Sequence, residues 1–242
     1  MRIPRIYTDQ TLICEQNIIL ENTAANHIHR VLRLKTGSEL TLFNGLGGEY
    51  KAMIKSIDKR QVTVKVTHHN TKEIESPLNI TLVQGISRGE RMDYTIQKAV
   101  ELGVTRIVPI KTRRCTVKLD EIRAKKKIKH WQKIIVSACE QCGRNQIPTI
   151  ENITSFEKWL AEQHQAFNLI LDPTATLKIT ELKKPSIAIN LFVGPEGGFD
   201  DKELILAQTH QYTCIRLGPR ILRTETAPIT ALSALQTLWG DL

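Results

Sequence analysis

After about residue 77 the chain alternates between short apolar runs and segments with helical periodicity, and this alternation restricts the possible folds more than any other feature. Two of the apolar runs, 168–171 and 187–193, are typical of strands in a parallel sheet that is covered on both faces. The sequence therefore predicts an α/β domain. Because ligands of such sheets bind beyond the carboxyl ends of the strands, we expect the functional site there. Further strands are expected at 80–85, 106–110 and 214–217, and helices at 92–102, 119–142, 201–209 and 226–239.

The first 70 or so residues follow another pattern, in which short alternating runs are separated by tight turns. Small strands at this spacing predict a barrel or a compact sheet. The polar stretch 68–77 ends in Ser-Pro and marks the expected boundary between a domain at 1–72 and a domain at 73–242. Strands are expected at 39–43, 50–57 and 61–66, and a short helix at 24–32.

Charge and cysteine content narrow the class of protein. Lys and Arg total 34 against 25 Asp and Glu, a net charge of +9, which favours a polyanionic partner such as nucleic acid. No run approaches the ~20 apolar residues of a membrane span, and the first five residues lack the apolar core of a signal peptide, so a cytoplasmic protein is expected. The five cysteines are irregularly spaced, and Cys139-x-x-Cys142 lacks a second ligand pair, so neither a disulfide framework nor a metal site is expected.

Three loops follow predicted strands and are candidates for the site: 171–173, 194–200 and 217–227. The glycines of 194–200 would allow positive φ and a close approach of a ligand to the backbone. Asp200 is the expected N-cap of the helix that follows. A tight strand-to-helix turn without a ligand is the alternative for that loop. No P-loop or dinucleotide fingerprint is present in the sequence.

The loop at 217–227 is harder to explain as structure alone. Ile221 and Leu222 are apolar, yet they are flanked by Arg220 and Arg223. Helix capping would explain Thr226 and Glu225 but not the two arginines beside apolar residues. Apolar side chains and backbone groups at a strand end could form the wall of an adenine pocket.

The runs 194–199 and 217–227 resemble the cofactor-binding motifs of SPOUT methyltransferases, and among these the RsmE family. The segments 88–103 and 137–148 agree, so the resemblance covers essentially the whole chain. It implies S-adenosylmethionine-dependent methylation of N3 of a uridine, U1498 in conventional numbering, in 16S ribosomal RNA of the small ribosomal subunit. It also implies a PUA-like β-barrel for RNA binding, a SPOUT-type parallel sheet with a C-terminal trefoil knot, and a homodimer. The cofactor pocket would be lined by Leu171, Gly194, Glu196, Gly197, Leu217, Gly218, Ile221, Leu222 and Arg223.

Methylation of N3 requires removal of its proton, so a carboxylate base and an arginine near a carbonyl oxygen would serve. The candidate bases are Glu140, Glu225 and Glu101, and the sequence does not rank them. Arg223 and Arg144 are the arginines expected at the uracil or its phosphate. Because Glu140 and Arg144 are four residues apart on a predicted helix, an ordinary ion pair is the alternative for them.

Basic residues near the N-terminus and elsewhere are candidate RNA contacts, although for each of them a solvated basic surface is the alternative. An N-terminal patch would consist of Arg2, Arg5, His27, His29, Arg30, Arg33 and Lys35, with further contacts from Arg88, Arg91 and the run Lys125, Lys126, Lys127 and Lys129. Two other functions stay open: an RNA-binding ribosome-assembly factor without catalysis, and a SPOUT methyltransferase that acts on another RNA or on a ribose hydroxyl.

Overall fold

The computed structural model describes residues 3–58, 60–162 and 164–242. The chain divides into two compact units, which are described separately below. The first consists of Met1–Glu75 and Cys139–Ile147, and the second of Ser76–Ala138 and Pro148–Leu242. The division lies close to the expected boundary at 72/73, but the inclusion of 139–147 in the first unit was not anticipated.

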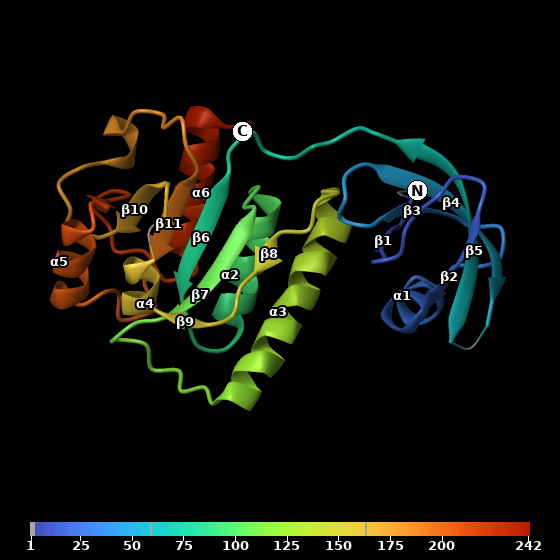
Figure 1. Cartoon of the computed structure of the whole chain (residues 1–242), viewed down its shortest axis with the longest axis horizontal. Helices are drawn as coiled ribbons and strands as arrows, with labels where there is room; N and C mark the ends of the chain where they lie inside the picture. Colours follow the sequence, from blue (N-terminus) through green and yellow to red (C-terminus); the bar gives the residue numbers. More distant parts are fainter. Residues whose placement is uncertain (1–2, 59, 163) are drawn as a thin grey trace. The chain divides into compact units, whose positions relative to one another are not determined.

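The second unit is built on a seven-stranded sheet in the order β12-β10-β11-β6-β7-β8, with β9 also paired to β7 (Figure 1). Every strand pair in it is parallel. All residues of β6 and β11 are buried, because both faces of the sheet are covered. The strands are β6 Ile80–Gly85, β7 Arg106–Lys111, β8 Thr149–Ile150, β9 Thr154–Ser155, β10 Phe167–Leu171, β11 Ile189–Val193 and β12 Thr213–Ile215.

Helices flank this sheet and complete the core. On one face, Phe156 and Trp159 of α4 and Ala207 of α5 pack with strand residues that include Phe192 of β11. The helices α2 and α6 pack against each other. The helices are α2 Glu90–Glu101, α3 Glu121–Cys142, α4 Phe156–Ala161, α5 Asp201–Thr209 and α6 Thr226–Trp239, with a 3₁₀ turn η2 at Ile179–Glu181.

The first unit contains a five-stranded sheet in the order β1-β3-β4-β5-β2, in which β1 and β3 are parallel and the other pairs antiparallel. Its core includes Leu42, Ile54 and Val64. The helix expected at 24–32 is a short α-helix followed by a π-helical turn. The elements are β1 Arg5–Tyr7, β2 Asn17–Glu21, α1 Asn22–Asn26, the π-turn η1 His27–Val31, β3 Glu39–Phe43, β4 Glu49–Ile57 and β5 Gln61–Asn70.

Membrane-spanning helices and metal clusters can be assessed for residues 3–58, 60–162 and 164–242. In those residues no helix combines the length and apolar character needed to cross a bilayer, and no group of three or more His, Cys, Asp or Glu is placed to hold a metal ion. All five cysteines are free. The trefoil knot that the resemblance implies stays a prediction.

Candidate active site

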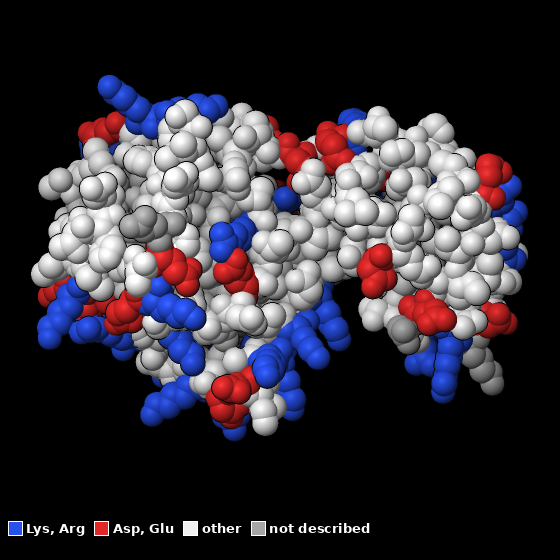
Figure 2. Space-filling model, in the orientation of Figure 1, with Lys and Arg blue, Asp and Glu red and all other residues white. Residues whose placement is uncertain are grey.

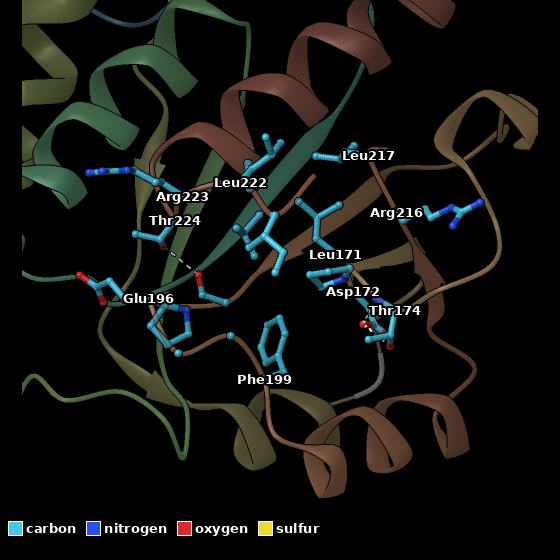
Figure 3. A pocket seen from close by; sticks show the side chains of 18 of the residues that line it. Leu171, Asp172, Thr174, Glu196, Phe199, Arg216, Leu217, Leu222, Arg223 and Thr224 are labelled. Atoms are coloured by element: carbon cyan, nitrogen blue, oxygen red, sulfur yellow. Dashed lines mark hydrogen bonds between the residues drawn. The ribbon is translucent and has the colours of Figure 1, made fainter. Parts of the chain in front are cut away.

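A cavity of about 730 Å³ lies at the carboxyl ends of β10, β11 and β12 (Figure 3). These strands are neighbours in the sheet, so the three loops that follow them meet at one edge. The volume is in the range of small-molecule and cofactor sites. The expected location of the site, beyond the strand ends, therefore coincides with a real cavity.

All nine residues expected to line a cofactor pocket do line this cavity. Leu171 ends β10, Gly194 follows β11, and 217–223 lies between β12 and α6. The structure thus brings the nine together, and their binding of a cofactor stays a prediction. Residues that were not among the nine complete the wall: Asp172 and Phe199 come from the candidate loops, and Arg114, Thr174 and Arg216 from outside them.

The apolar part of the wall comes from all three loops. Leu171, Leu222 and Phe199 project towards a common space in Figure 3. Gly194 is required by packing, because a Cβ there would lie 2.9 Å from the backbone of Gly198. Gly218 has a φ of 136° and no atom within 4 Å of where its Cβ would be, so the backbone at that point is accessible to a ligand.

Two buried polar residues fasten the third loop to the second. The Thr224 hydroxyl donates to the carbonyl of Gly194 at 2.9 Å. Gln84, at the end of β6, donates from Nε2 to the same carbonyl at 3.5 Å and to Thr224 Oγ1 at 3.4 Å. These contacts hold the loop after β12 against the loop after β11.

Asp172 supplies a buried carboxylate to the wall formed by the first loop. It is only 9% exposed, and its Oδ1 accepts hydrogen bonds from the backbone N and the hydroxyl of Thr174 at 2.8 and 2.7 Å. The carboxylate caps the turn after β10, and no hydrogen bond within the described part of the chain reaches Oδ2. Sequence reasoning could have found this residue only from its place at a strand end.

Two further carboxylates at the cavity share one arginine. Arg91 lies 3.0 Å from Glu196 Oε1 through Nη1 and 3.7 Å from Glu225 Oε2 through Nε. Burial alone would raise the pKa of Glu196, but hydrogen bonds from the backbone N of Arg88 and from Arg91 outweigh it, so the pKa lies below its ordinary value. Glu225 Oε2 is buried and has no hydrogen-bond partner among the described residues.

The three candidate bases have different surroundings. Only Glu225 lines the cavity. Glu101 forms an ion pair with Lys98 at the end of α2, at 2.8 Å. Glu140 belongs to the first unit, where its Oε1 accepts a hydrogen bond from the backbone N of Tyr7 at 3.0 Å and its Oε2 lies 3.7 Å from His27 Nδ1. Burial raises the pKa of Glu140, although the Tyr7 hydrogen bond and the nearby His27 and Arg5 oppose this.

Arg144 and Arg5 are both held inside the first unit. Arg144 follows the end of α3, its side chain is 6% exposed, and its Nε donates to Glu75 at 2.7 Å. Arg5 pairs with Glu49 and donates to the carbonyl of Arg144 at 3.1 Å. Either arginine would have to leave these partners to contact RNA, so the catalytic role of Arg144 and the RNA contact of Arg5 stay predictions.

The other candidate RNA contacts are mostly at the surface. Arg223 is exposed at the cavity, and Arg88 is exposed beside it, with Nε donating to Thr116 Oγ1 at 2.7 Å. Arg2 lies outside the described residues. The remaining exposed candidates are His29, Arg30, Arg33, Lys35, Lys125, Lys126 and Lys129.

Comparison with known proteins identifies the family. Residues 74–236 match the RNA methyltransferase domain family, and residues 20–67 match the RNA methyltransferase PUA domain family. The chain is 39% identical over 242 residues to the ribosomal RNA small subunit methyltransferase E of Buchnera aphidicola subsp. Schizaphis graminum, covering all of this chain and 98% of that one. The chain belongs to the ribosomal RNA small subunit methyltransferase E (RsmE) family. The family and, apart from the knot, the fold class expected from the sequence are therefore confirmed, and with them the class of enzyme, an RNA methyltransferase.

Two solved structures, of a Legionella pneumophila putative methyltransferase and of a Neisseria gonorrhoeae enzyme, agree with this assignment. A Legionella pneumophila protein in complex with S-adenosylmethionine is 43% identical, with a TM-score of 0.97 and full coverage of both chains. The ribosomal RNA small subunit methyltransferase E of Neisseria gonorrhoeae, also bound to S-adenosylmethionine, is 42% identical, with a TM-score of 0.95 and 99% coverage of each chain. Both therefore hold the cofactor that the sequence of this chain predicts.

Proposed function

We propose that this chain transfers the methyl group of S-adenosylmethionine to N3 of one uridine of 16S ribosomal RNA, U1498 in conventional numbering. The observation that carries the proposal is the cavity at the ends of β10, β11 and β12, which unites all nine expected cofactor residues in a member of the RsmE family. In line with the family resemblance, the substrate would be the small ribosomal subunit in the cytoplasm, and the enzyme a homodimer.

The cavity fits the chemical groups of the cofactor. Apolar side chains such as Leu171, Leu217 and Leu222 suit the faces of an adenine ring, and the exposed backbone at Gly218 suits its polar edge. Asp172 and Glu196 are acceptors for ribose hydroxyl and amino groups. When bound, S-adenosylmethionine supplies a methyl group on a positively charged sulfur.

Glu225 is the base that the geometry favours. It lines the cavity directly before α6, and its buried Oε2 could accept the N3 proton as the methyl group is transferred. Negative charge then develops on O2 and O4 of the uracil. The exposed guanidinium of Arg223 and the N-terminal end of α6, which carries a partial positive charge, are placed to stabilise it.

The identity of the methylated nucleoside distinguishes this function from the alternatives. Purified protein would be incubated with labelled S-adenosylmethionine and small subunits that lack the modification, and the ribosomal RNA would be digested to nucleosides for mass spectrometry. We expect 3-methyluridine from one site, and none when large subunits replace small ones. The proposal would be overturned by a methylated ribose, by another methylated base, or by label in transfer RNA only. RNA binding without any methyl transfer would favour the assembly factor.

A further inference from the structure

Four of the five lysines in α3 lie along one face of its first part, and the fifth, Lys127, is half-buried with its Nζ 5.9 Å from the centroid of the Trp131 ring. At 3.6 residues per turn, Lys125, Lys126, Lys129 and Lys133 fall within a narrow stripe. All four are exposed. The opposite side of the helix is anchored in the core by the buried Trp131, Ile135 and Ala138. We call these four lysines the α3 lysine face.

The charge of the α3 lysine face is not neutralised within the described part of the chain. None of its four lysines has a carboxylate within ion-pair distance there, and Glu121 is the only acidic residue of α3 before Glu140. A helix that is merely solvated usually carries carboxylates three or four residues from its lysines. Glu121 stands four residues before Lys125, but no acidic residue stands at that spacing from the other three lysines. Here four positive charges stand along about 12 Å of helix, at 1.5 Å per residue.

Basic residues continue from this helix towards the cavity. Lys111, Lys118 and Arg123 line a second hollow, of about 470 Å³, where Asp120 pairs with Arg123 at 3.4 Å. Arg114 lines the candidate cofactor cavity and donates to the carbonyl of Gly197 at 3.1 Å. Figure 2 shows Lys and Arg side chains gathered where Figure 1 places the first half of α3. Basic side chains of the second unit thus lie at the cavity, at the second hollow and along the first half of α3.

We propose that the α3 lysine face binds the phosphate backbone of ribosomal RNA outside the segment that enters the cavity. The inference rests on the proposed function, whose site it extends. Lysines act as point charges that position a polyanion without reading its sequence. An acidic protein is the less suitable partner, because the cores of protein interfaces are depleted of lysine and enriched in aromatic residues, whereas α3 exposes Ile122 as the one large apolar residue near the stripe.

A matched pair of triple variants tests the α3 lysine face. The first is Lys125→Gln, Lys126→Gln and Lys129→Gln; the control is Lys158→Gln, Lys183→Gln and Lys202→Gln, which removes the same charge from exposed lysines elsewhere in the second unit. Glutamine keeps the helix propensity of lysine, so folding should be retained, as checked by circular dichroism. Methylation kinetics on small subunits and binding to naked 16S ribosomal RNA would be measured for both variants and the wild type.

For the first variant we expect a KM for small subunits at least tenfold higher than that of the wild type, with kcat at saturation and affinity for S-adenosylmethionine unchanged. The slope of log affinity for naked RNA against log salt should fall by roughly 2–3, because each lost phosphate contact removes about 0.7–0.9. The control should match the wild type.

The inference would be overturned if the Lys125→Gln, Lys126→Gln and Lys129→Gln variant had the KM of the wild type and the same dependence of RNA affinity on salt. It would also be overturned by weaker binding to intact subunits without weaker binding to naked RNA, which would indicate a protein of the subunit as the partner. Failure of the proposed function is a separate result, because it appears in the wild type as the absence of 3-methyluridine.

Discussion

At the scale of single residues, the account depends on which carboxylate removes the N3 proton. Glu225→Gln keeps the shape of the side chain but removes its basicity, and should lower kcat on small subunits about 100-fold or more. Affinity for S-adenosylmethionine should change little. Glu101→Gln, which alters a carboxylate paired with Lys98 outside the cavity, is the control and should keep its activity. A fully active Glu225→Gln enzyme would exclude this residue as the base.

Glu140 gives a prediction about pH and stability. Burial raises its pKa in the folded protein, so the folded state binds this proton more tightly than the unfolded state. Its contribution to stability is therefore greatest at low pH and is lost as pH rises through the folded pKa. The amide of Glu140→Gln is neutral at every pH and its oxygen can still accept the hydrogen bond from Tyr7. The variant should therefore have a higher free energy of unfolding than the wild type at pH 7.5, where Glu140 is charged. The difference should be smaller at pH 4.5. Urea unfolding at both values measures this, and a relative gain that is independent of pH would contradict it.

The sequence predicted the cavity residues that lie in loops directly after strands. It did not predict those that other parts of the chain contribute through tertiary structure. Gly194 and Leu217 were accessible because their motifs directly follow apolar strands. Gln84 and Arg114 reach the same site from other strands and loops, and no local pattern indicates this. Arg91 was expected to bind RNA, and its contacts with Glu196 and Glu225 emerge only from the fold.

At the scale of elements, the segments with strong periodicity were predicted well. The strand 80–85 and the helices 201–209 and 226–239 have the bounds that the sequence predicts. The two-residue strands β8 and β9 and the six-residue α4 were missed, because elements so short show no periodicity. The N-cap expected at Asp200 is confirmed, since its side chain accepts a hydrogen bond from the backbone N of Glu203 at 2.8 Å.

The start of α5 gives a prediction at this scale. Glu203 is 1% exposed, and its carboxylate accepts from the backbone N of Asp200 at 2.9 Å and of Arg113 at 2.8 Å. Glu203→Ala would leave both donors without this acceptor and should cost about 2–3 kcal/mol of unfolding free energy in urea titrations. Asp201→Ala, an exposed residue of the same helical turn, should cost less than about 1 kcal/mol. Equal losses in the two variants would contradict this explanation.

At the scale of the whole molecule, the first unit is not a continuous stretch of sequence. Glu75 accepts hydrogen bonds from Arg144 Nε and from the backbone N of Asn145 and Gln146, and Arg5 donates to Asn145 Oδ1. Local patterns could not show this, because these contacts join residues about 70 to 140 positions apart in the sequence.

An isolated fragment 1–75 should therefore be much less stable than the same region of the full chain. The segment that provides partners for Glu75 and Arg5 would be missing from it. Hydrogen exchange of the β3–β5 amides measures the difference, and a synthetic peptide of residues 139–147 should restore part of the protection. Protection in the fragment equal to that in the full chain would show that the second segment is dispensable.

The central claim is that the cavity at the ends of β10, β11 and β12 binds S-adenosylmethionine, and calorimetric titration of the purified protein tests it most directly. Ile221→Asp alters a side chain that lines the cavity but is 85% exposed, so it should not disturb folding. Ile205→Asp, at a 61% exposed position of α5 outside the cavity, is the control. We predict binding to the wild type and to the control, and at least tenfold weaker binding to Ile221→Asp. The claim would be contradicted if the wild type bound no S-adenosylmethionine, with or without small subunits. Equal affinity in all three proteins would also contradict it.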